Sequence, residues 1–162
     1  MPFKFVPATV ADVPSLTALE VAEAAQMTRG SGPRRPPPPG IEKKVRSRLK
    51  NSSVYVAREN GRLIVALRLG TKKPRTMDTK YFQPCARPLY FLGVTVAPYR
   101  RNVETGLRCM EETARIARER LADALRLDAC EENREFYRKC GFKEVGRVVN
   151  KTVPLIYFEM LL

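Results

Sequence analysis

The sequence of 162 residues contains no histidine and no tryptophan, and it has only four cysteines. The absence of histidine excludes the Ser–His and Cys–His pairs of many hydrolases, so acid–base chemistry must come from Tyr, Cys, Lys, Asp, Glu or water. The cysteines, at positions 85, 109, 130 and 140, show no Cys-x-x-Cys spacing. We therefore expect inert thiols, with no disulfide bonds and no metal site.

Long apolar runs are also missing. No stretch approaches the ~20 apolar residues that a membrane-spanning helix needs. The first residues, Met-Pro-Phe-Lys-Phe-Val, lack the apolar core of a signal peptide. We expect a cytoplasmic protein without a membrane segment. Hydrophobic residues make up 44% of the chain, which is typical of a globular protein, and the length predicts one domain over residues 1–162.

What the chain has in excess is positive charge: 30 Lys and Arg residues against 17 Asp and Glu residues give a net charge of +13. The excess is concentrated in two segments. Residues 29–50 contain eight basic residues and one acidic residue, and residues 72–87 contain five and one. This concentration favours an anionic partner, with two solvated basic loops as the alternative interpretation.

The periodicity of apolar residues predicts an α/β fold with a mixed sheet and helices on both faces. Prolines 36–39 predict a stiff spacer within a basic segment, residues 29–40, and residues 70–87 predict a long basic loop that is functional or mobile. Asn60-Gly61 predicts a hairpin turn. The order is β-α-α-β-β-β-α-β-α-β-β. The expected strands are 3–7, 53–58, 63–69, 89–96, 124–128, 144–149 and 155–161, and the expected helices are 12–26, 41–49, 103–121 and 131–140.

Residues 89–112 read as a buried strand, a turn and an amphipathic helix. A turn that enters a helix presents unpaired N–H groups and the positive end of the helix dipole, so Pro98–Gly106 is a candidate anion site. Arg100 and Arg101 add positive charge there.

Cys109 lies one step off the apolar stripe of this helix, where we expect partial exposure. The stripes are Val103, Leu107, Met110, Ala114, Ala117 and Leu121 in this helix, and Val13, Leu16, Leu19 and Ala22 or Glu23 in the first.

Three features together resemble the GCN5-related N-acetyltransferase (GNAT) superfamily. They are the order of elements, the turn Pro98-Tyr-Arg-Arg-Asn-Val-Glu-Thr-Gly106 and the segment Glu135-Phe-Tyr-Arg-Lys-Cys-Gly-Phe142. The resemblance covers essentially the whole chain, and residues 122–129 and 153–159 are similar to one bacterial branch. It implies a sheet that splays at Gly93, where acetyl-CoA lies in a V-shaped opening, and it implies no metal.

In that family the pyrophosphate of acetyl-CoA lies on a turn with the pattern Gln/Arg-x-x-Gly-x-Gly/Ala. By this resemblance Arg101 takes the first position and Gly106 the last, while Glu104 stands where the middle glycine is expected. A glutamate there adds a side chain and a negative charge near an anion. Pointing to solvent it would weaken binding, and pointing inward it would impair the enzyme. The implied cofactor-binding residues are Val94, Thr95, Val96, Arg101, Asn102, Val103, Glu104, Thr105, Gly106, Leu107 and Asn133.

The resemblance also gives Tyr137 the role of the catalytic acid that protonates the departing CoA thiolate, because a phenol stays protonated at neutral pH. A half-buried packing residue is the alternative. A backbone N–H at Gly93 would polarise the thioester carbonyl. The strand from Pro88 to Val96 contains no carboxylate, so the general base is left open among Tyr90, Asp128 and a water chain.

The resemblance therefore implies an acetyl-CoA-dependent N-acetyltransferase in which a primary amine attacks the thioester directly. The expected acceptor is a small-molecule or peptide amine, anionic or linked to RNA because of the two basic segments, and a homodimer is among the expectations. Two alternatives remain open: a CoA-binding relative that has lost activity, suggested by Glu104, and a basic nucleic-acid-binding module, suggested by residues 29–50.

Overall fold

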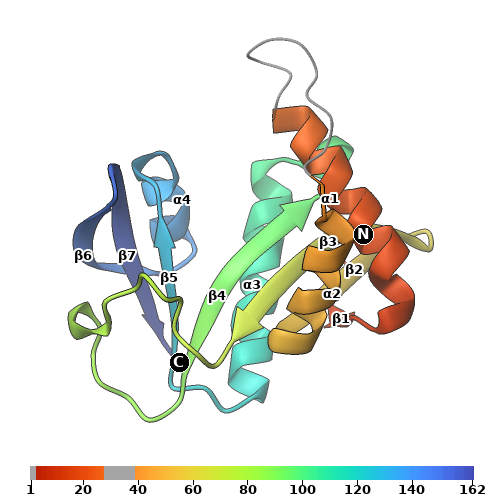
Figure 1. Ribbon diagram of the computed structural model, residues 1–162. Coiled ribbons are helices and arrows are strands. Elements are labelled where there is room, and N and C mark those ends of the chain that lie inside the picture. Colours follow the sequence, from red (N-terminus) through yellow and green to blue (C-terminus); the bar gives the residue numbers. More distant parts are fainter. Residues whose placement is uncertain (1–2, 28–38) are drawn as a thin grey trace. The chain divides into compact units, whose positions relative to one another are not determined.

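The computed structural model describes residues 3–27 and 39–162 (Figure 1). Internal contacts divide the chain into two units. Unit 1 consists of Met1–Arg68 and Gly93–Arg108, and unit 2 consists of Leu69–Leu92 and Cys109–Leu162. Most of the predicted Pro-rich segment 29–40 lies outside the described residues. No helix in the described ranges is long and apolar enough to cross a membrane.

The described residues form four α-helices and a seven-stranded mixed sheet, so the predicted order of elements and the fold class are confirmed. The strands lie in the order β1-β2-β3-β4-β5-β7-β6, with β4 and β5 parallel and the β1–β2, β5–β7 and β6–β7 pairs antiparallel. The strands are β1 (Val6–Pro7), β2 (Ser53–Glu59), β3 (Arg62–Gly70), β4 (Pro88–Val96), β5 (Ala124–Ala129), β6 (Lys143–Asn150) and β7 (Val153–Leu161). The helices are α1 (Val13–Met27), α2 (Ile41–Asn51), α3 (Val103–Glu119) and α4 (Arg134–Lys139).

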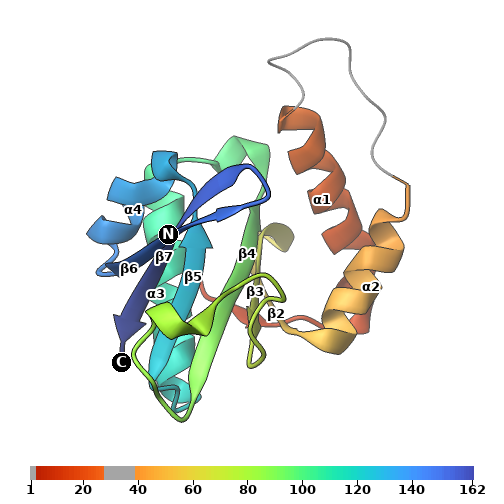
Figure 2. The same cartoon turned by 60° about the vertical axis from the view of Figure 1, so that its left-hand side comes forward.

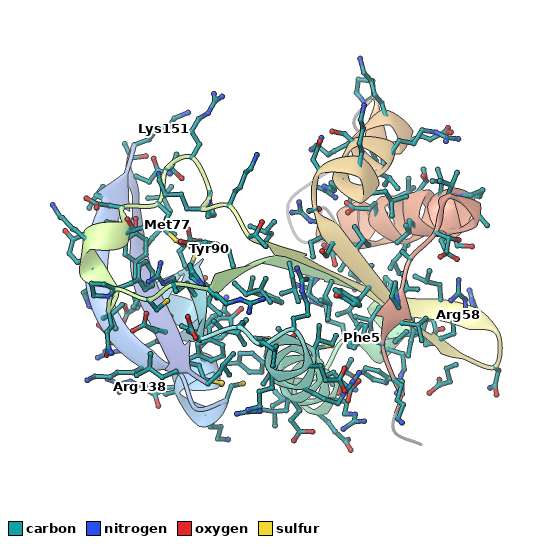
Figure 3. All side chains as sticks on the ribbon, turned by 90° about the horizontal axis from the view of Figure 1, so that it is seen from below. Phe5, Arg58, Met77, Tyr90, Arg138 and Lys151 are labelled. Atoms are coloured by element: carbon teal, nitrogen blue, oxygen red, sulfur yellow. The ribbon has the colours of Figure 1, made fainter. Side chains whose placement is uncertain are left out.

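Unit 1 contains α1, α2, β1 and β2, with most of β3 and the end of β4. The predicted first strand, residues 3–7, is wrong in length, because only Val6 and Pro7 pair with β2. Phe3 and Phe5 are instead buried and pack edge to face. Figure 3 labels Phe5 and, nearby, Arg58, which forms an ion pair with Asp12 at the start of α1. Core packing therefore takes precedence over strand pairing at residues 3–5.

The turn between β2 and β3 is formed by Asn60 and Gly61, with φ values of 52° and 75°. Both residues have the positive φ that a tight hairpin of this hand requires. The predicted hairpin is confirmed.

Helix α3 corrects three sequence predictions. Val103 and Leu121 were placed on the buried stripe, but they are 62% and 67% exposed. Leu121 follows the end of the helix and has a φ of 59°, so the helical period no longer applies to it. Cys109 was expected to be partly exposed, but it is buried, and burial raises the pKa of its thiol to about 12. This thiol is therefore uncharged and unreactive at neutral pH.

In unit 2 the long loop between β3 and β4 is packed against the sheet. Met77 and Phe82 of the loop are buried against Tyr90 and Tyr157, as Figure 3 shows for Met77 and Tyr90. The Tyr157 hydroxyl accepts a hydrogen bond from the Asp78 backbone N–H at 3.1 Å. The loop is thus anchored near its middle, and its basic residues project from a fixed support.

A buried arginine on β5 completes this anchor. Arg126 donates from Nη1 to the Tyr90 hydroxyl at 2.9 Å and from Nη2 to the Gln83 carbonyl at 2.8 Å. Its Nε lies 3.5 Å from the carboxylate of Glu159 on β7, and both side chains are 6% exposed. A buried charge must be paired, and Glu159 supplies the opposite charge. Through these contacts the guanidinium connects the loop to β4 and β7.

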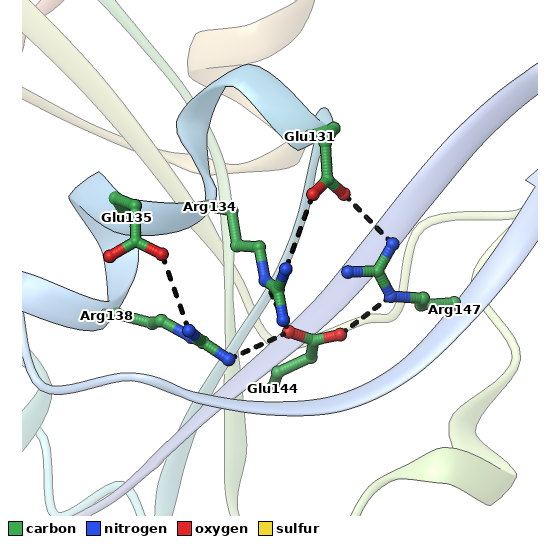
Figure 4. Close-up of polar contacts among 6 residues, drawn as sticks. All are labelled: Glu131, Arg134, Glu135, Arg138, Glu144 and Arg147. Carbon is green, nitrogen blue, oxygen red and sulfur yellow. Dashed lines mark hydrogen bonds and ion pairs between the residues drawn. The ribbon is translucent and has the colours of Figure 1, made fainter.

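Helix α4 packs against β6 at the other edge of unit 2 (Figure 2). A network of ion pairs connects the two elements (Figure 4). Glu144 on β6 accepts from Arg134 at 3.0 Å and from Arg147 at 2.8 Å. Burial alone would raise the pKa of Glu144, but these arginines outweigh it and hold the pKa below its usual value. The network comprises Glu131, Arg134, Glu135, Arg138, Glu144 and Arg147.

Candidate functional site

The predicted anion-binding turn begins where β4 ends. The Ala97 N–H donates to the Ile64 carbonyl of β3 at 2.7 Å, and a single 3-10 turn, Pro98–Arg100, follows. Asn102 then caps α3: its Oδ1 accepts from the Thr105 N–H at 2.8 Å, and its carbonyl accepts from the Gly106 N–H at 3.1 Å. The sheet and the cap together fix the backbone of the turn.

This capping pattern narrows the predicted set of phosphate donors. The N–H groups of Thr105 and Gly106 are satisfied within the helix start, although both residues were predicted to bind the cofactor. The first turn of a helix has four N–H groups without intrahelical acceptors in the general case. The cap satisfies the Thr105 N–H, and the Gly106 N–H makes the first regular helical bond, so the N–H groups of Val103 and Glu104 are among those left without a helical acceptor.

The two arginines of the turn have different environments. Arg100 forms an ion pair with Glu59 of β2 at 3.2 Å and is partly buried. Arg101 is exposed, as is the side chain of Glu104. Of the two outcomes considered for Glu104, the structure therefore shows the one in which its side chain reaches solvent. Arg101 is thus the more exposed of the two arginines.

Two carboxylates of α1 reach the end of β4. Glu23 Oε2 accepts a hydrogen bond from the Val96 N–H at 3.0 Å, and Glu20 Oε1 lies 3.5 Å from the Thr95 hydroxyl that donates to it. Burial raises the pKa of Glu23, and this effect outweighs the lowering by the Val96 hydrogen bond and by the charge of Arg101. A half-buried carboxylate of raised pKa is a candidate proton acceptor.

Sequence reasoning missed Glu20 and Glu23 because it sought the base on the strands, at Tyr90 or Asp128, or in a water chain, and not on the first helix. The signal was present: the two residues are three apart on one helix, and Glu23 fell on the otherwise apolar face. A carboxylate on a buried helix face needs a polar partner, and here the partner is a backbone N–H of the central strand.

Tyr137 lies in α4, surrounded by aromatic rings. The ring centroids of Phe136, Phe142 and Phe158 lie 5.1, 5.8 and 5.5 Å from its own. Burial raises the pKa of Tyr137 to about 12, and Cys140 and Asp128 act in the same direction. The ring is thus held by packing while the hydroxyl remains protonated at neutral pH, which an acid catalyst requires.

The remaining predicted residues are placed as follows. Tyr90, one proposed base, is buried, and its hydroxyl accepts from Arg126. Asp128, another, is half-buried, and burial raises its pKa. Asn133 is exposed at the start of α4, where its N–H donates to the Cys130 carbonyl at 3.0 Å. Gly93 has a φ of 152°. Arg126 makes Tyr90 the least suited of these to accept a proton.

The parallel pairing of β4 with β5 has a defined register. Pro88, Leu89 and Tyr90 pair with Ala124, Leu125 and Arg126. Strand β4 continues beyond this register to Val96, which includes the predicted pantetheine-binding residues Val94, Thr95 and Val96. The assignment of these three residues to the cofactor stays a prediction.

No family model matches the sequence, and no curated protein matches it. Solved structures do match in fold. A GNAT-family acetyltransferase from Streptococcus agalactiae is similar at a TM-score of 0.74 and 12% identity, over 99% of this chain and 95% of that one. A ribosomal-protein-alanine N-acetyltransferase from Brucella melitensis is similar at 0.67 and 21%, over 98% and 99%. A GCN5-related N-acetyltransferase from Rhodopseudomonas palustris is similar at 0.67 and 18%, over 100% and 97%. The chain therefore has the fold of the GCN5-related N-acetyltransferases.

Proposed function

We propose that the protein is an acetyl-CoA-dependent N-acetyltransferase that acts on a primary amine by direct attack. The observation that carries the proposal is the start of α3. There the Asn102 cap leaves the amides of Val103 and Glu104 at the positive end of a long helix, with Arg101 exposed beside them. Backbone donors, a helix dipole and a guanidinium are together suited to a diphosphate.

The residues present fit the cofactor at this turn. The side chain of Glu104, the departure from the family pattern, is exposed, and the backbone N–H groups remain accessible to an anion. Asn102 and Thr105 act through the cap. The cap orients the backbone N–H groups of Val103 and Glu104, which have no acceptor within the helix. Acetyl-CoA would supply the activated acetyl group, and the chain would hold the diphosphate at Arg101, Val103 and Glu104.

The backbone N–H of Val96, at the end of β4, would also take part in the reaction. The Val96 N–H, which the resemblance assigns to the pantetheine arm, donates to the Glu23 carboxylate in this structure. A ligand carbonyl at Val96 would replace that carboxylate. Glu23 would then be released with a raised pKa, as a base for the ammonium of the acceptor. Cofactor binding would thereby prepare the proton acceptor.

Tyr137 would act in the last step, when the CoA thiolate departs. Its hydroxyl would donate a proton to the departing thiolate. Because the pKa of Tyr137 is raised to about 12, the hydroxyl is still protonated at neutral pH when the thiolate leaves. Much of the rate would come from holding the amine and the thioester together. No covalent acetyl-enzyme is required.

Calorimetry with acetyl-CoA, followed by thiol release over a panel of amines, peptides and tRNA, tests the proposal. We expect micromolar to millimolar binding and turnover with at least one amine. If the protein binds acetyl-CoA but acetylates no amine of the panel, it is a CoA-binding relative that has lost activity. If it does not bind acetyl-CoA but binds RNA with an affinity that falls steeply with salt, it is a nucleic-acid-binding module.

A further inference from the structure

The long loop between β3 and β4, drawn in yellow-green in Figure 1, has a basic tip formed by residues 71–76. The sequence of this loop tip is Thr-Lys-Lys-Pro-Arg-Thr, which contains no acidic residue. All of its side chains are exposed except that of Pro74, which is half-buried. The loop tip therefore presents three cations to solvent, those of Lys72, Lys73 and Arg75.

The backbone of the loop tip is held by the core of unit 2. The Met77 N–H donates to the Pro74 carbonyl at 3.0 Å, which closes a turn with Arg75 and Thr76 at its centre. Met77 itself is 2% exposed and packs in the cluster that contains Tyr157. Because the turn ends at a buried residue, the loop tip is positioned before any partner arrives, and a partner would not have to order it.

The positive charge of the loop tip is only partly compensated. The Lys73 ammonium donates to the Met77 carbonyl at 3.1 Å, which leaves it two further donors. Asp78, the first carboxylate after the loop tip, forms its ion pair with Lys80 at 3.4 Å. Among the described residues, Lys72 and Arg75 form no ion pair. An anion at the loop tip would therefore reduce the repulsion between neighbouring cations.

Phosphate groups are the anions that suit the loop tip best. Lysine ammonium groups and threonine hydroxyls commonly contact phosphate oxygens, whereas carboxylates are matched best by the planar fork of arginine, and two of the three cations are lysines. Residues 71–76 include no aromatic ring on which a base could stack. They also include no large apolar side chain that could anchor a peptide. Recognition here would thus depend on phosphates and be independent of base sequence.

We propose that the loop tip binds the phosphodiester backbone of a single-stranded nucleic acid. Lys72, Lys73 and Arg75 contact successive phosphates, and the hydroxyls of Thr71 and Thr76 donate to phosphate oxygens beside them. This surface is distinct from the turn that is proposed to hold the diphosphate of acetyl-CoA. The inference goes beyond the proposed function and does not depend on it.

Fluorescence anisotropy with labelled oligouridine, oligothymidine and oligoglutamate of equal length, without acetyl-CoA and at several salt concentrations, tests the inference. We expect the oligonucleotides to bind with a Kd of about 10⁻⁴–10⁻⁶ M near physiological salt. The triple variant Lys72→Gln, Lys73→Gln, Arg75→Gln should raise this Kd by about 10- to 100-fold. The slope of log affinity against log salt should become shallower by about 2, because each phosphate contact to a single strand contributes about 0.7.

The matched control is the triple variant Arg118→Gln, Lys139→Gln, Lys143→Gln, which removes three exposed positive charges from the same unit. It should weaken binding by less than about threefold, through the general attraction alone, and keep the wild-type slope.

The inference is overturned if neither oligonucleotide binds, if the control loses as much affinity as the loop-tip variant, or if oligoglutamate binds as tightly as the oligonucleotides. The last result would assign the loop tip to an acidic protein. Binding of only one oligonucleotide would support the inference and identify the nucleic acid as RNA or DNA. Absence of acetyl-CoA binding in calorimetry would refute the proposed function and leave this inference standing.

Discussion

Replacing Tyr137 with Phe is expected to lower kcat by about 10²- to 10⁴-fold, the usual contribution of a general acid. The dissociation constant of acetyl-CoA should stay the same, because the hydroxyl acts on the leaving thiolate. The phenyl ring would keep the contacts with Phe136, Phe142 and Phe158, so the fold should tolerate the change. Steady-state kinetics with calorimetry separate the two quantities.

The pH dependence of kcat gives a second readout of the same residue. The acid form is the active form, and the pKa of Tyr137 is raised to about 12. Activity should therefore show no loss from ionisation of this group throughout the neutral and mildly alkaline range. Tyr81→Phe is the control, since Tyr81 packs on Tyr157 in the same unit and has no assigned role. An unchanged kcat in Tyr137→Phe would leave this residue a packing role only.

Replacing Arg101 with Ala is expected to raise the dissociation constant of acetyl-CoA by about 10- to 100-fold, because a charge-assisted hydrogen bond to a phosphate contributes about 1.5–3 kcal/mol. Binding should also become less sensitive to salt. Calorimetry at two salt concentrations measures both effects. The loss should be smaller for ligands that lack the diphosphate.

Arg100→Ala provides the comparison within the same turn. Arg100 is paired with Glu59, so its removal should lower stability slightly and leave affinity nearly intact. Equal losses of affinity in the two variants, or a larger loss in Arg100→Ala, would show that the roles of these two arginines are assigned incorrectly.

Local patterns were sufficient to predict much of the fold. Asn60-Gly61 requires a tight turn, and Gly141, with a φ of 95°, ends α4 as expected for a helix terminated by glycine. The continuous apolar run of β4 and the helix after it are likewise local properties. Such signals depend on a residue and its sequence neighbours, so a single sequence contains them.

The errors come from contacts between distant residues. The Glu23 carboxylate contacts a strand that lies 73 residues later in the sequence. Arg126 likewise bonds to the loop between β3 and β4, and the lack of a period in that loop gave no sign of this contact. Leu121 had the right spacing for the stripe but follows the last helical turn. The burial of Cys109 depends on tertiary packing of α3, which the helical period alone does not determine.

The candidate site divides in the same way. The turn before α3 and the helix with Tyr137 were found because each has a local sequence pattern. The contacts of Glu20 and Glu23 with the end of β4 were not, because they join residues 75 and 73 positions apart in the sequence. Neither carboxylate belongs to a motif, and only the fold brings them to the strand.

A crystal structure of the protein with acetyl-CoA would show directly which atoms hold the cofactor. Diphosphate oxygens within hydrogen-bond distance of the Val103 and Glu104 amides, with Arg101 beside them and the Glu104 carboxylate in solvent, are the expected result. A diphosphate bound at another surface, or a Glu104 carboxylate lying over those amides, would contradict it.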